Sequence, residues 1–436
     1  MLEDFLRHHA QATPHKLAVI CGGERVTYAQ LWSRVQHRAD ALRPMHAPHT
    51  IVALRTQQSV DFLVEYFALH LMGAVAMPLE RDMPQQRFDE ISHRYDGFVA
   101  PPEVADVLFT TGTTGKSKGV MVSHDTIIAE AENLADAMPF SPDQTFIITG
   151  PLNHIGSLSK VFPVIMLGAT LHILEGMKDL EAFFRAIADA PGQVATFMVP
   201  ASIRMALQLG KRQWAELADK MAFIETGAAP MAHSDMLELC RVLPNTRLYN
   251  TYASTETGMV ATYDYNDGET LVGCLGRPMK NSTFFITPEG TVACQGRTLM
   301  TGYADDPEMT AQVLRDNTLY TADLAHIDEQ GRLRLMGRND DVINIGGYKV
   351  APTEVEDAAM AFDGINDCIC ICDLSPLLGN RLKLLVVLAD GVPLDKRALA
   401  RHIAARLESY KVPQLYEAVD HIERTFNGKL NRKHYR

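Results

Sequence analysis

The sequence predicts an α/β fold in two parts, a large N-terminal layered domain with mixed sheets flanked by helices and a small C-terminal α+β domain. The first observation is length, because 436 residues are enough for two or more domains. The second is composition, since 47% hydrophobic and 22% charged residues are the ordinary balance of a soluble globular protein. The third is the alternation of short apolar runs with helical segments, which is typical of layered α/β folds.

The N-terminal part holds the strand and helix candidates of the layered domain. The strand candidates are apolar runs that end in turn-forming residues, namely LAVICGG, TIVALR, GAVAMPL, VLFTTG, TFIITG, QVATFMVP and AFIETG. Helical candidates between them include TYAQLWSRVQHRADAL and TIIAEAENLADAM. We find no internal repeat and no low-complexity linker.

The pattern changes after Arg338, where the charged turn GRNDD precedes the small domain. Thr353 and Glu356 have capping-box spacing and Pro352 stands just before them, so we expect a helix to begin there. Two strand-like runs, CICICDL and LKLLVVLA, and the helix candidate DKRALARHIAARLESY follow. We therefore place the N-terminal domain at residues 1–338, a hinge at 339–341 and the C-terminal domain at 342–436.

Charge and hydropathy narrow the classes of partner. A formal net charge of -12 argues against a general nucleic-acid or lipid surface, which needs clustered Lys and Arg. The N-terminus MLEDFLRHHA lacks the basic start and apolar run of a secretory signal, so we expect a cytoplasmic protein. The longest nearly uncharged stretch, residues 161–174, is too short to span a bilayer and suits a buried strand or helix. The expected partner is a small molecule, with a monomer and a homodimer both open.

Seven cysteines are scattered without a C-x-x-C pair, so neither a disulfide framework nor a zinc ribbon is indicated. Cys368, Cys370 and Cys372 fall on one face of a predicted strand, where a metal site is conceivable. We favour the simpler interpretation, three small apolar side chains in the core of a strand in a reduced compartment.

The stretch FTTGTTGKSKG, residues 109–119, is a candidate phosphate-binding loop. It resembles a Walker A loop in its second half only, because Thr110 stands where that loop requires glycine. Its glycines leave backbone amides open to an anion, and hydroxyls with Lys116 and Lys118 add donors. Strand-like runs on both sides also fit a plain glycine-rich hairpin, and the residues alone leave the two interpretations about even.

Three further segments carry residues suited to nucleotide chemistry. Glu256 in YNTYASTETG could hold Mg²⁺ beside phosphate oxygens. Asp323 in LYTADLAHID could accept hydrogen bonds from ribose hydroxyls, and Lys429 would be displayed at the Asn-Gly turn of ERTFNGKLNRK. Each has an ordinary structural alternative, namely a capping Glu, a turn Asp and an exposed Lys.

Taken together and in order, these motifs resemble those of the adenylate-forming superfamily, which includes acyl- and aryl-CoA synthetases, adenylation domains of nonribosomal peptide synthetases and luciferases. The segments that carry the resemblance are TTGTTGKSKG, GAAP, NTYASTE, GRTLMTGY, YTADL, GRNDDVINIGGYKVAPTEVE and NGKLNRK. It runs over most of the chain and is nearest to the compact acyl- and aryl-CoA ligases. It implies attack of a carboxylate on the α-phosphate of ATP, release of pyrophosphate, and capture of the acyl-adenylate by a thiol.

The resemblance assigns roles residue by residue. The residues that would hold the phosphates of ATP are Thr110, Thr111, Gly112, Thr113, Thr114, Gly115, Lys116 and Lys118. Asn250 and Tyr252 would take the adenine, and Asp323 and Arg338 would bind the ribose. Gly227, Ala228, Ala229 and Ala253 would also belong to the nucleotide-binding site. Glu256, helped by Thr255, would carry Mg²⁺. Lys429 would be the catalytic lysine of a mobile C-terminal domain that swings about Asp340.

The chain departs from the family pattern in several places. Ser117 stands where proline is usual, and Ala253 and Ala322 replace glycines. Glu423 also stands where proline is usual, and we have no explanation for that replacement. Only about 30 residues separate GAVAMPLE from the phosphate loop, so we expect an abbreviated N-terminal subdomain.

The acid substrate is the least determined part. PLNHIGSLS resembles a stretch of acyl- and aryl-CoA ligases in which a histidine borders the acid pocket, so His154 is a candidate for that position. The alternative, a core histidine bonded to the backbone, is only slightly less favoured. The segment has no acid before Glu175, which disfavours an α-amino acid. The leading hypothesis is an AMP-forming acid:CoA ligase. The alternatives are an enzyme that loads the phosphopantetheine of a separate carrier protein, and a nucleotide-binding protein without catalysis.

Overall fold

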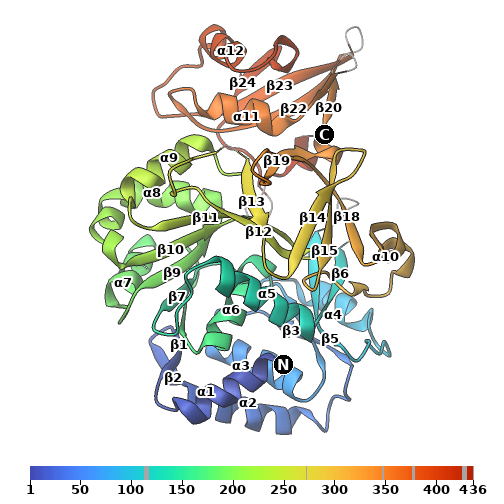
Figure 1. Cartoon of the computed structure of the whole chain (residues 1–436). Coiled ribbons are helices and arrows are strands. Elements are labelled where there is room, and N and C mark those ends of the chain that lie inside the picture. Colours follow the sequence, from blue (N-terminus) through green and yellow to red (C-terminus); the bar gives the residue numbers. More distant parts are fainter. Residues whose placement is uncertain (112–116, 272, 346–347, 376–378, 425–429, 436) are drawn as a thin grey trace.

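The structure is a computed structural model that describes residues 1–111, 117–271, 273–345, 348–375, 379–424 and 430–435. Figure 1 shows a large body that contains both N-terminal sheets, with the C-terminal residues forming a smaller domain above it. The predicted α/β class, a large layered domain with mixed sheets and a small α+β domain, is confirmed. No helix among the described residues is long and apolar enough to cross a membrane.

The larger sheet joins a parallel half to an antiparallel half. Its strands, in spatial order, are β14 (Ser282–Ile286), β15 (Thr291–Gly296), β18 (Thr318–Ile327), β19 (Leu333–Arg338), β13 (Cys274–Pro278), β12 (Gly258–Asp264), β11 (Arg247–Ser254), β10 (Met221–Thr226), β9 (Val194–Met198), β7 (Thr145–Ile148), β8 (Thr170–Ile173), β1 (Leu17–Cys21) and β2 (Glu24–Thr27), with β17 (Leu314–Arg315) beside β18. From β11 to β1 all neighbours pair in parallel. These parallel strands are apolar runs because both of their faces are covered.

Helices cover both faces of the parallel half (Figure 1). The outer helices are α7 (Leu180–Asp189), α8 (Pro200–Glu216) and α9 (His233–Val242), and their core contains Phe183, Trp214 and Leu239 against Ile224 of β10. The inner helices are α5 (His124–Ala137) and α6 (Ile155–Leu167), which share a second core with Phe146 and Phe223. Helix α5 contacts β12 of the larger sheet and β6 of the second sheet, so the domain is layered.

The second sheet is smaller and carries the candidate phosphate loop. Its order is β16 (Gly302–Tyr303), β6 (Ser117–Ser123), β5 (Val104–Thr111), β4 (Val75–Leu79) and β3 (Ile51–Arg55). Helix α3 (Val60–Leu71) contacts β3 and β4, and α10 (Pro307–Val313) contacts β16. Helices α1 (Leu2–Ala12) and α2 (Tyr28–Leu42) pack against α3, and α4 (Gln85–His93) follows β4 in the chain. Helix α4 is the only helix described between β4 and β5, in the connection that we expected to be short.

The C-terminal strands pair only with one another among the described residues. The elements are β20 (Ile343–Ile345), β21 (Tyr348–Val350), α11 (Pro352–Met360), β22 (Ile365–Ser375), β23 (Gly379–Leu388), α12 (Lys396–Ala404) and β24 (Leu415–Ala418). Short 3-10 turns lie at Asn339–Asp341, Ser409–Lys411 and Arg432–Tyr435, and a further one in the large domain lies at Ala218–Lys220. Leu399 and Ile403 of α12 are fully buried in a core separate from those of the body. The predicted hinge, residues 339–341, coincides with the turn Asn339–Asp341, although the domain boundaries themselves stay a prediction.

One local expectation of the small domain is wrong. Helix α11 begins where we expected, at Pro352, but its N-cap is Ala351 and no side chain caps it. Thr353 Oγ1 donates instead to the backbone oxygen of Met336 at 3.1 Å, and Glu356 accepts from Arg432 at 2.7 Å. The two partners of the supposed capping box are therefore drawn away by tertiary contacts.

Two of the three cysteines of β22 are small core residues. Cys368 is 2% exposed and Cys370 is 1% exposed, whereas Cys372 is exposed, and all seven cysteines are free thiols. No cysteine among the described residues belongs to a group close enough to hold a metal. The expectation of three core thiols therefore holds for Cys368 and Cys370 and is wrong for Cys372, which lies near the exposed end of the strand.

Candidate active site

A cleft of about 370 Å³ lies where the β5–β6 hairpin, the start of α6, the β11–β12 turn and strands β18 and β19 meet. Segments far apart in the chain contribute to it. The predicted site residues that line it are Thr110, Lys118, His154, Gly227, Ala228, Ala253, Thr255, Glu256, Asp323 and Arg338. The structure thus collects in one place most of the described residues that the sequence singled out.

The candidate phosphate loop is a hairpin between two antiparallel strands. Thr110 of β5 lies opposite Lys118 of β6, and both line the cleft. The ammonium of Lys118 lies 5.1 Å from the centroid of the Tyr303 ring, which keeps this cation at the cleft wall. Residues Gly112, Thr113, Thr114, Gly115 and Lys116 lie outside the described residues, as does the side chain of Thr111.

Glu256 is placed to receive a cation. The Tyr303 hydroxyl donates to its Oε1 at 3.2 Å, and burial together with the charge of Glu256 raises the pKa of Tyr303, so the phenol stays a donor. No lysine, arginine or histidine side chain within the described part of the chain pairs with this carboxylate, which leaves its second oxygen available. A carboxylate with spare acceptor capacity at a cleft wall fits Mg²⁺, a hard cation that takes oxygen ligands.

The turn that carries Thr255 and Glu256 is held from several sides. Ser254 and Thr257 exchange hydrogen bonds at 3.0 Å, and Thr298 Oγ1 donates to the Thr257 backbone oxygen at 2.9 Å. Gly258 has φ of +63°, and a Cβ there would meet the Thr298 backbone oxygen at 2.5 Å. The turn therefore needs glycine at this position.

Asp323 and Arg338 lie opposite each other on β18 and β19, with 3.7 Å between Oδ1 and Nη1. Tyr252 donates its hydroxyl to Asp323 Oδ2 at 2.7 Å. Burial and the Asp323 charge raise the pKa of Tyr252 well above its ordinary value, so the hydroxyl keeps its proton. The hydrogen bond from Tyr252 to Oδ2 thus fixes the orientation of the Asp323 carboxylate. A carboxylate held in this way is suited to accept hydrogen bonds from the two neighbouring hydroxyls of a ribose.

The other residues expected to bind the nucleotide line the cleft only in part. Gly227 and Ala228 line the cleft, and Ala228 has φ of +68°, a left-handed backbone that few residues with a side chain adopt. Ala229, Asn250 and Tyr252 are not among the residues of the cleft wall. Asn250 donates instead to the backbone oxygen of Cys274 at 3.1 Å. The adenine role of Asn250 and Tyr252 and the nucleotide-binding role of Ala229 stay predictions.

His154 combines the two roles that the sequence left open. It is the N-cap of α6, and its Nδ1 accepts from the backbone N–H of Gly156 at 3.2 Å. It also lines the cleft. An accepting Nδ1 places the proton of the neutral ring on Nε2, which makes Nε2 a donor for an oxygen of a bound acid.

An ion pair that sequence reasoning missed lies beside this end of the cleft. Lys160 of α6 contacts Glu225 of β10 at 2.7 Å, with side-chain exposures of 0% and 1%. The Lys160 ammonium also lies 5.1 Å from the ring centroid of Phe197, and all three residues border the cleft. The only signal in the sequence was a single charged residue inside each of two apolar segments.

Lys429 lies outside the described residues, and so does the side chain of Asp340. The small domain nevertheless contacts the body through described residues. Arg204 of α8 donates to the Asn366 backbone oxygen at 3.0 Å, and its guanidinium lies 3.6 Å from Asp367. The catalytic role of Lys429 and the hinge role of Asp340 stay predictions.

Comparison with known proteins identifies the family. The profile described as AMP-binding enzyme matches residues 6–96 and 96–304, and that of the AMP-binding enzyme C-terminal domain matches residues 354–429. The first two matched segments meet at residue 96, within the short connection between β4 and β5. The chain belongs to the family of AMP-binding enzymes, the adenylate-forming superfamily. Within it, the chain is an AMP-forming enzyme of the acyl- and aryl-CoA ligase type, as the motifs indicated.

Individual relatives agree with this placement. The chain is 26% identical to an indoleacetate–CoA ligase of Aromatoleum aromaticum over 99% of this chain and 96% of the relative. It is 25% identical to a 2-succinylbenzoate–CoA ligase of a Geobacillus species, with the same coverage of 99% and 96%. The crystal structure of ATP-bound MatB from Rhodopseudomonas palustris has the same fold, with a TM-score of 0.88 at 24% identity over 100% of this chain and 99% of that one.

Proposed function

We propose that this chain activates a carboxylic acid with ATP and Mg²⁺, releases pyrophosphate, and transfers the acyl group of the resulting adenylate to CoA. The observation that carries the proposal is the single cleft in which Lys118, Glu256, Asp323 and His154 meet. The first three suit phosphate, magnesium and ribose, and the fourth stands beside an apolar wall where an acid would lie. Adenylation needs little acid-base chemistry, because catalysis rests on holding charged groups in position.

The charges of the cleft match the steps of this reaction. Negative charge develops on the α-phosphate and on the departing pyrophosphate, so cations must be in place beforehand. Lys118 on the hairpin would stabilise the pyrophosphate, and Mg²⁺ held at Glu256 would supply further positive charge at the phosphates. Asp323 would fix the ribose, which orients the α-phosphate toward the acid. His154, with its proton on Nε2, would donate to the acid and set its direction of attack.

The acid is proposed to be aromatic or acyl, without an α-ammonium group. The wall near His154 includes Phe197, Ile155 and Met259, which are apolar. The nearby carboxylate of Glu225 already pairs with Lys160 at 2.7 Å, so the ammonium of an amino acid would have to displace a buried cation to reach it. Apolar acids face no such cost in this cleft.

The experiment is to incubate the protein with Mg²⁺-ATP and a pool of aryl and acyl acids, with and without CoA, and to identify the nucleotide product. AMP with pyrophosphate, in an amount that rises when CoA is added, supports the proposal, and dividing the pool identifies the acid. The exposed variant Glu289→Gln serves as a control for Glu256→Gln, which should lose the product. Release of ADP would contradict the mechanism.

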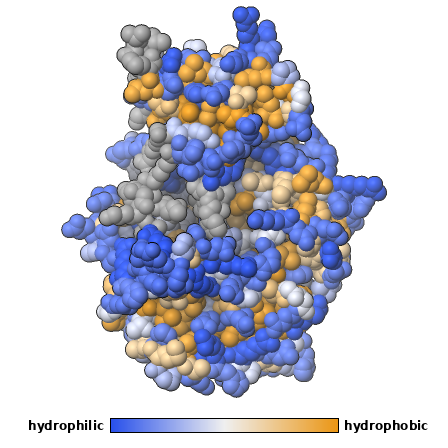
Figure 2. Space-filling model, turned by 180° about the vertical axis from the view of Figure 1, so that it is seen from behind, coloured by the Kyte–Doolittle hydropathy of each residue, from blue (hydrophilic) through white to orange (hydrophobic). Residues whose placement is uncertain are grey.

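A second candidate is transfer of the acyl group to the phosphopantetheine of a separate carrier protein. Figure 2 shows apolar side chains gathered on one face of the small domain. The exposed apolar residues of that domain include Tyr348, Leu374 and Val392. Such a patch would suit a docking protein. The test is to replace CoA by carrier proteins bearing phosphopantetheine. Thioester on a carrier, with none on CoA and loss in Leu374→Ser, would favour this candidate.

A further inference from the structure

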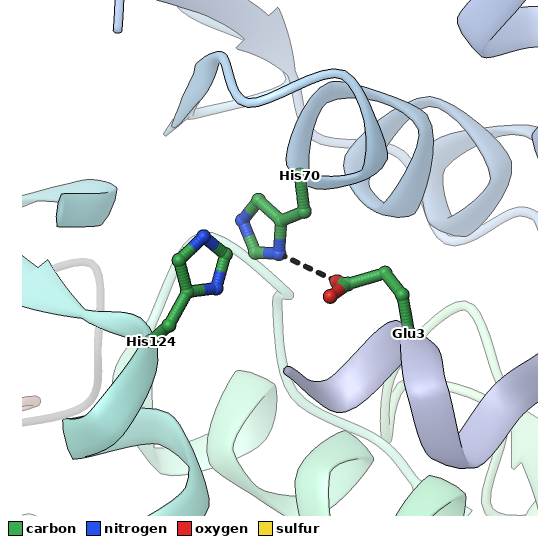
Figure 3. Close-up of side chains that lie close together, drawn as sticks. All are labelled: Glu3, His70 and His124. Carbon is green, nitrogen blue, oxygen red and sulfur yellow. Dashed lines mark hydrogen bonds and ion pairs between the residues drawn. The ribbon is translucent and has the colours of Figure 1, made fainter. Parts of the chain in front are cut away.

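A cluster of charged and polar side chains lies away from the cleft, where α1, α3, β5 and the start of α5 meet (Figure 3). Glu3 comes from α1, His70 from α3, Asp106 from β5 and His124 from the start of α5. Glu3 and His70 are each 1% exposed and Asp106 is 0% exposed. None of the four lines the cleft, so the proposed ligase reaction leaves the cluster unexplained.

Hydrogen bonds arrange His70 between two carboxylates. Its Nδ1 lies 2.9 Å from Glu3 Oε1, and its Nε2 lies 2.9 Å from Asp106 Oδ1. Tyr66 donates its hydroxyl to the other oxygen of Asp106 at 2.8 Å. The His70 ring is therefore fixed in direction, with Asp106 held in turn by the tyrosine.

Two polar groups in the cluster lack partners. Glu3 Oε2 is buried and has no hydrogen-bond partner within the described residues. The half-buried His124 ring has an edge-to-face contact with His70, at 5.3 Å between centroids, but no described residue hydrogen-bonds to its nitrogens. Buried polar atoms in proteins are normally satisfied. Figure 3 shows the side chains of His124, His70 and Glu3 lying close together.

The charges are also unbalanced. One histidine ring, that of His70, lies between two buried carboxylates, those of Glu3 and Asp106. No lysine or arginine among the described residues pairs with either carboxylate. The site therefore has room for further positive charge.

We propose that Glu3, His70 and His124 bind a divalent transition-metal ion of the Zn²⁺ type, with Asp106 as the residue that orients His70. One ligand atom from each of the three lies within 4.8 Å of the others. Two imidazoles and one carboxylate are a donor set that Zn²⁺ takes and that Mg²⁺ and Ca²⁺ do not favour. Ligating histidines commonly donate their other N–H to a carboxylate, the arrangement that Asp106 already provides.

The ion would replace the proton on His70 Nδ1, so its two positive charges would balance the carboxylates of Glu3 and Asp106. In a tetrahedral site with bonds of about 2.0–2.2 Å, ligand atoms stand about 3.4 Å apart. Small rotations of the three side chains would therefore bring their ligand atoms to the distances that the ion requires. The fourth position is left for water. Because Asp106 lies on β5 and His124 directly follows β6, the ion would join α1 and α3 to the base of the hairpin that carries Thr110 and Lys118.

The test uses the untagged full chain, freed of metal by a chelator and then titrated with Zn²⁺ alone. We expect one ion bound per chain by calorimetry and a higher unfolding temperature with Zn²⁺. Both effects should weaken in His124→Ala and in Glu3→Gln, with affinity lower by about tenfold or more. The exposed variant His93→Ala should bind as the wild type does. His124→Ala is the safest probe, because the ring makes no hydrogen bond to any described residue and its loss removes only the ring contact with His70.

Cobalt substitution identifies the donor atoms. Co²⁺ in the proposed site should give the visible absorption of a four-coordinate ion without a thiolate charge-transfer band, and His124→Ala should abolish that absorption. The proposal is overturned if no stoichiometric ion binds, if His124→Ala and Glu3→Gln bind Zn²⁺ as tightly as the wild type, or if a thiolate band shows that cysteines hold the ion. In those cases the imidazolium and carboxylates of this cluster hold the helices together without a metal.

Discussion

The buried pair of Lys160 and Glu225 allows a quantitative prediction. Replacing Lys160 by Met removes the ammonium that contacts the carboxylate at 2.7 Å and leaves that carboxylate 1% exposed and unpaired. Breaking such a buried pair from one side costs about 3–5 kcal/mol of unfolding free energy. Glu225→Leu should cost a similar amount, because it leaves the ammonium unpaired. The double variant Lys160→Met/Glu225→Leu removes both charges and should be within about 1–2 kcal/mol of the wild type.

Urea unfolding of the four proteins gives the coupling energy of the pair. We expect a coupling of several kcal/mol, because the two single losses share one cause. The control is the exposed pair Arg185 and Glu181 on α7, which are 61% and 83% exposed and should couple by only about 0.3–0.5 kcal/mol. If Lys160→Met costs less than about 1 kcal/mol, or if both pairs couple equally, the inferred burial of the Lys160 pair is refuted.

Three further predictions concern the reaction and the pH dependence of stability. Glu256→Gln should lower adenylation by about 10²- to 10³-fold and raise the Mg²⁺ concentration needed, as measured by AMP release, because a carboxamide binds Mg²⁺ poorly. Lys429→Gln should lower adenylation similarly but leave thioester formation from a preformed acyl-adenylate intact, whereas exposed Lys396→Gln should change neither. Burial raises the pKa of Glu130 to about 8 in the folded protein, from an ordinary value of 4.5. Between these two pH values the unfolded chain has lost the proton and the folded chain still holds it, so the free energy of unfolding should fall by several kcal/mol as the pH rises from about 5 to 8. Glu130→Gln should flatten this fall in urea unfolding, and an unchanged slope would contradict the assignment.

The parallel strands could be predicted from the sequence because both of their faces are buried. TFIITG and QVATFMVP became β7 and β9, whose residues are all buried. The antiparallel strands gave a weaker signal, since β14 has only two of its five residues buried, in alternation with exposed or half-buried ones. Their identity depends on pairing with distant strands, which a local pattern does not contain. The failed capping box has the same origin, because Glu356 is drawn away by Arg432, 76 positions along the chain.

The candidate site shows a similar division. Glu256, Asp323 and Lys118 were found through motifs, and the fold brings them to one cleft. Lys160 and Glu225 were missed because a lone charge in an apolar segment indicates that a partner is needed but does not say which residue it is. The cluster around His70 was missed for the same reason, since its four residues come from separate elements. Residues whose role depends on a partner distant in the sequence can be recognised only once the fold is known.

The measurement that tests the central claim most directly is acid-dependent exchange of labelled pyrophosphate into ATP. The reaction needs only ATP, Mg²⁺, pyrophosphate and the acid, so it reports adenylation without regard to the thiol that accepts the acyl group. We predict exchange that requires an acid from the aryl and acyl pool, is strong in the wild type and in Glu289→Gln, and is lost in Glu256→Gln. Exchange that Glu256→Gln leaves unchanged would contradict the assignment of the cleft, and release of ADP would contradict adenylation itself.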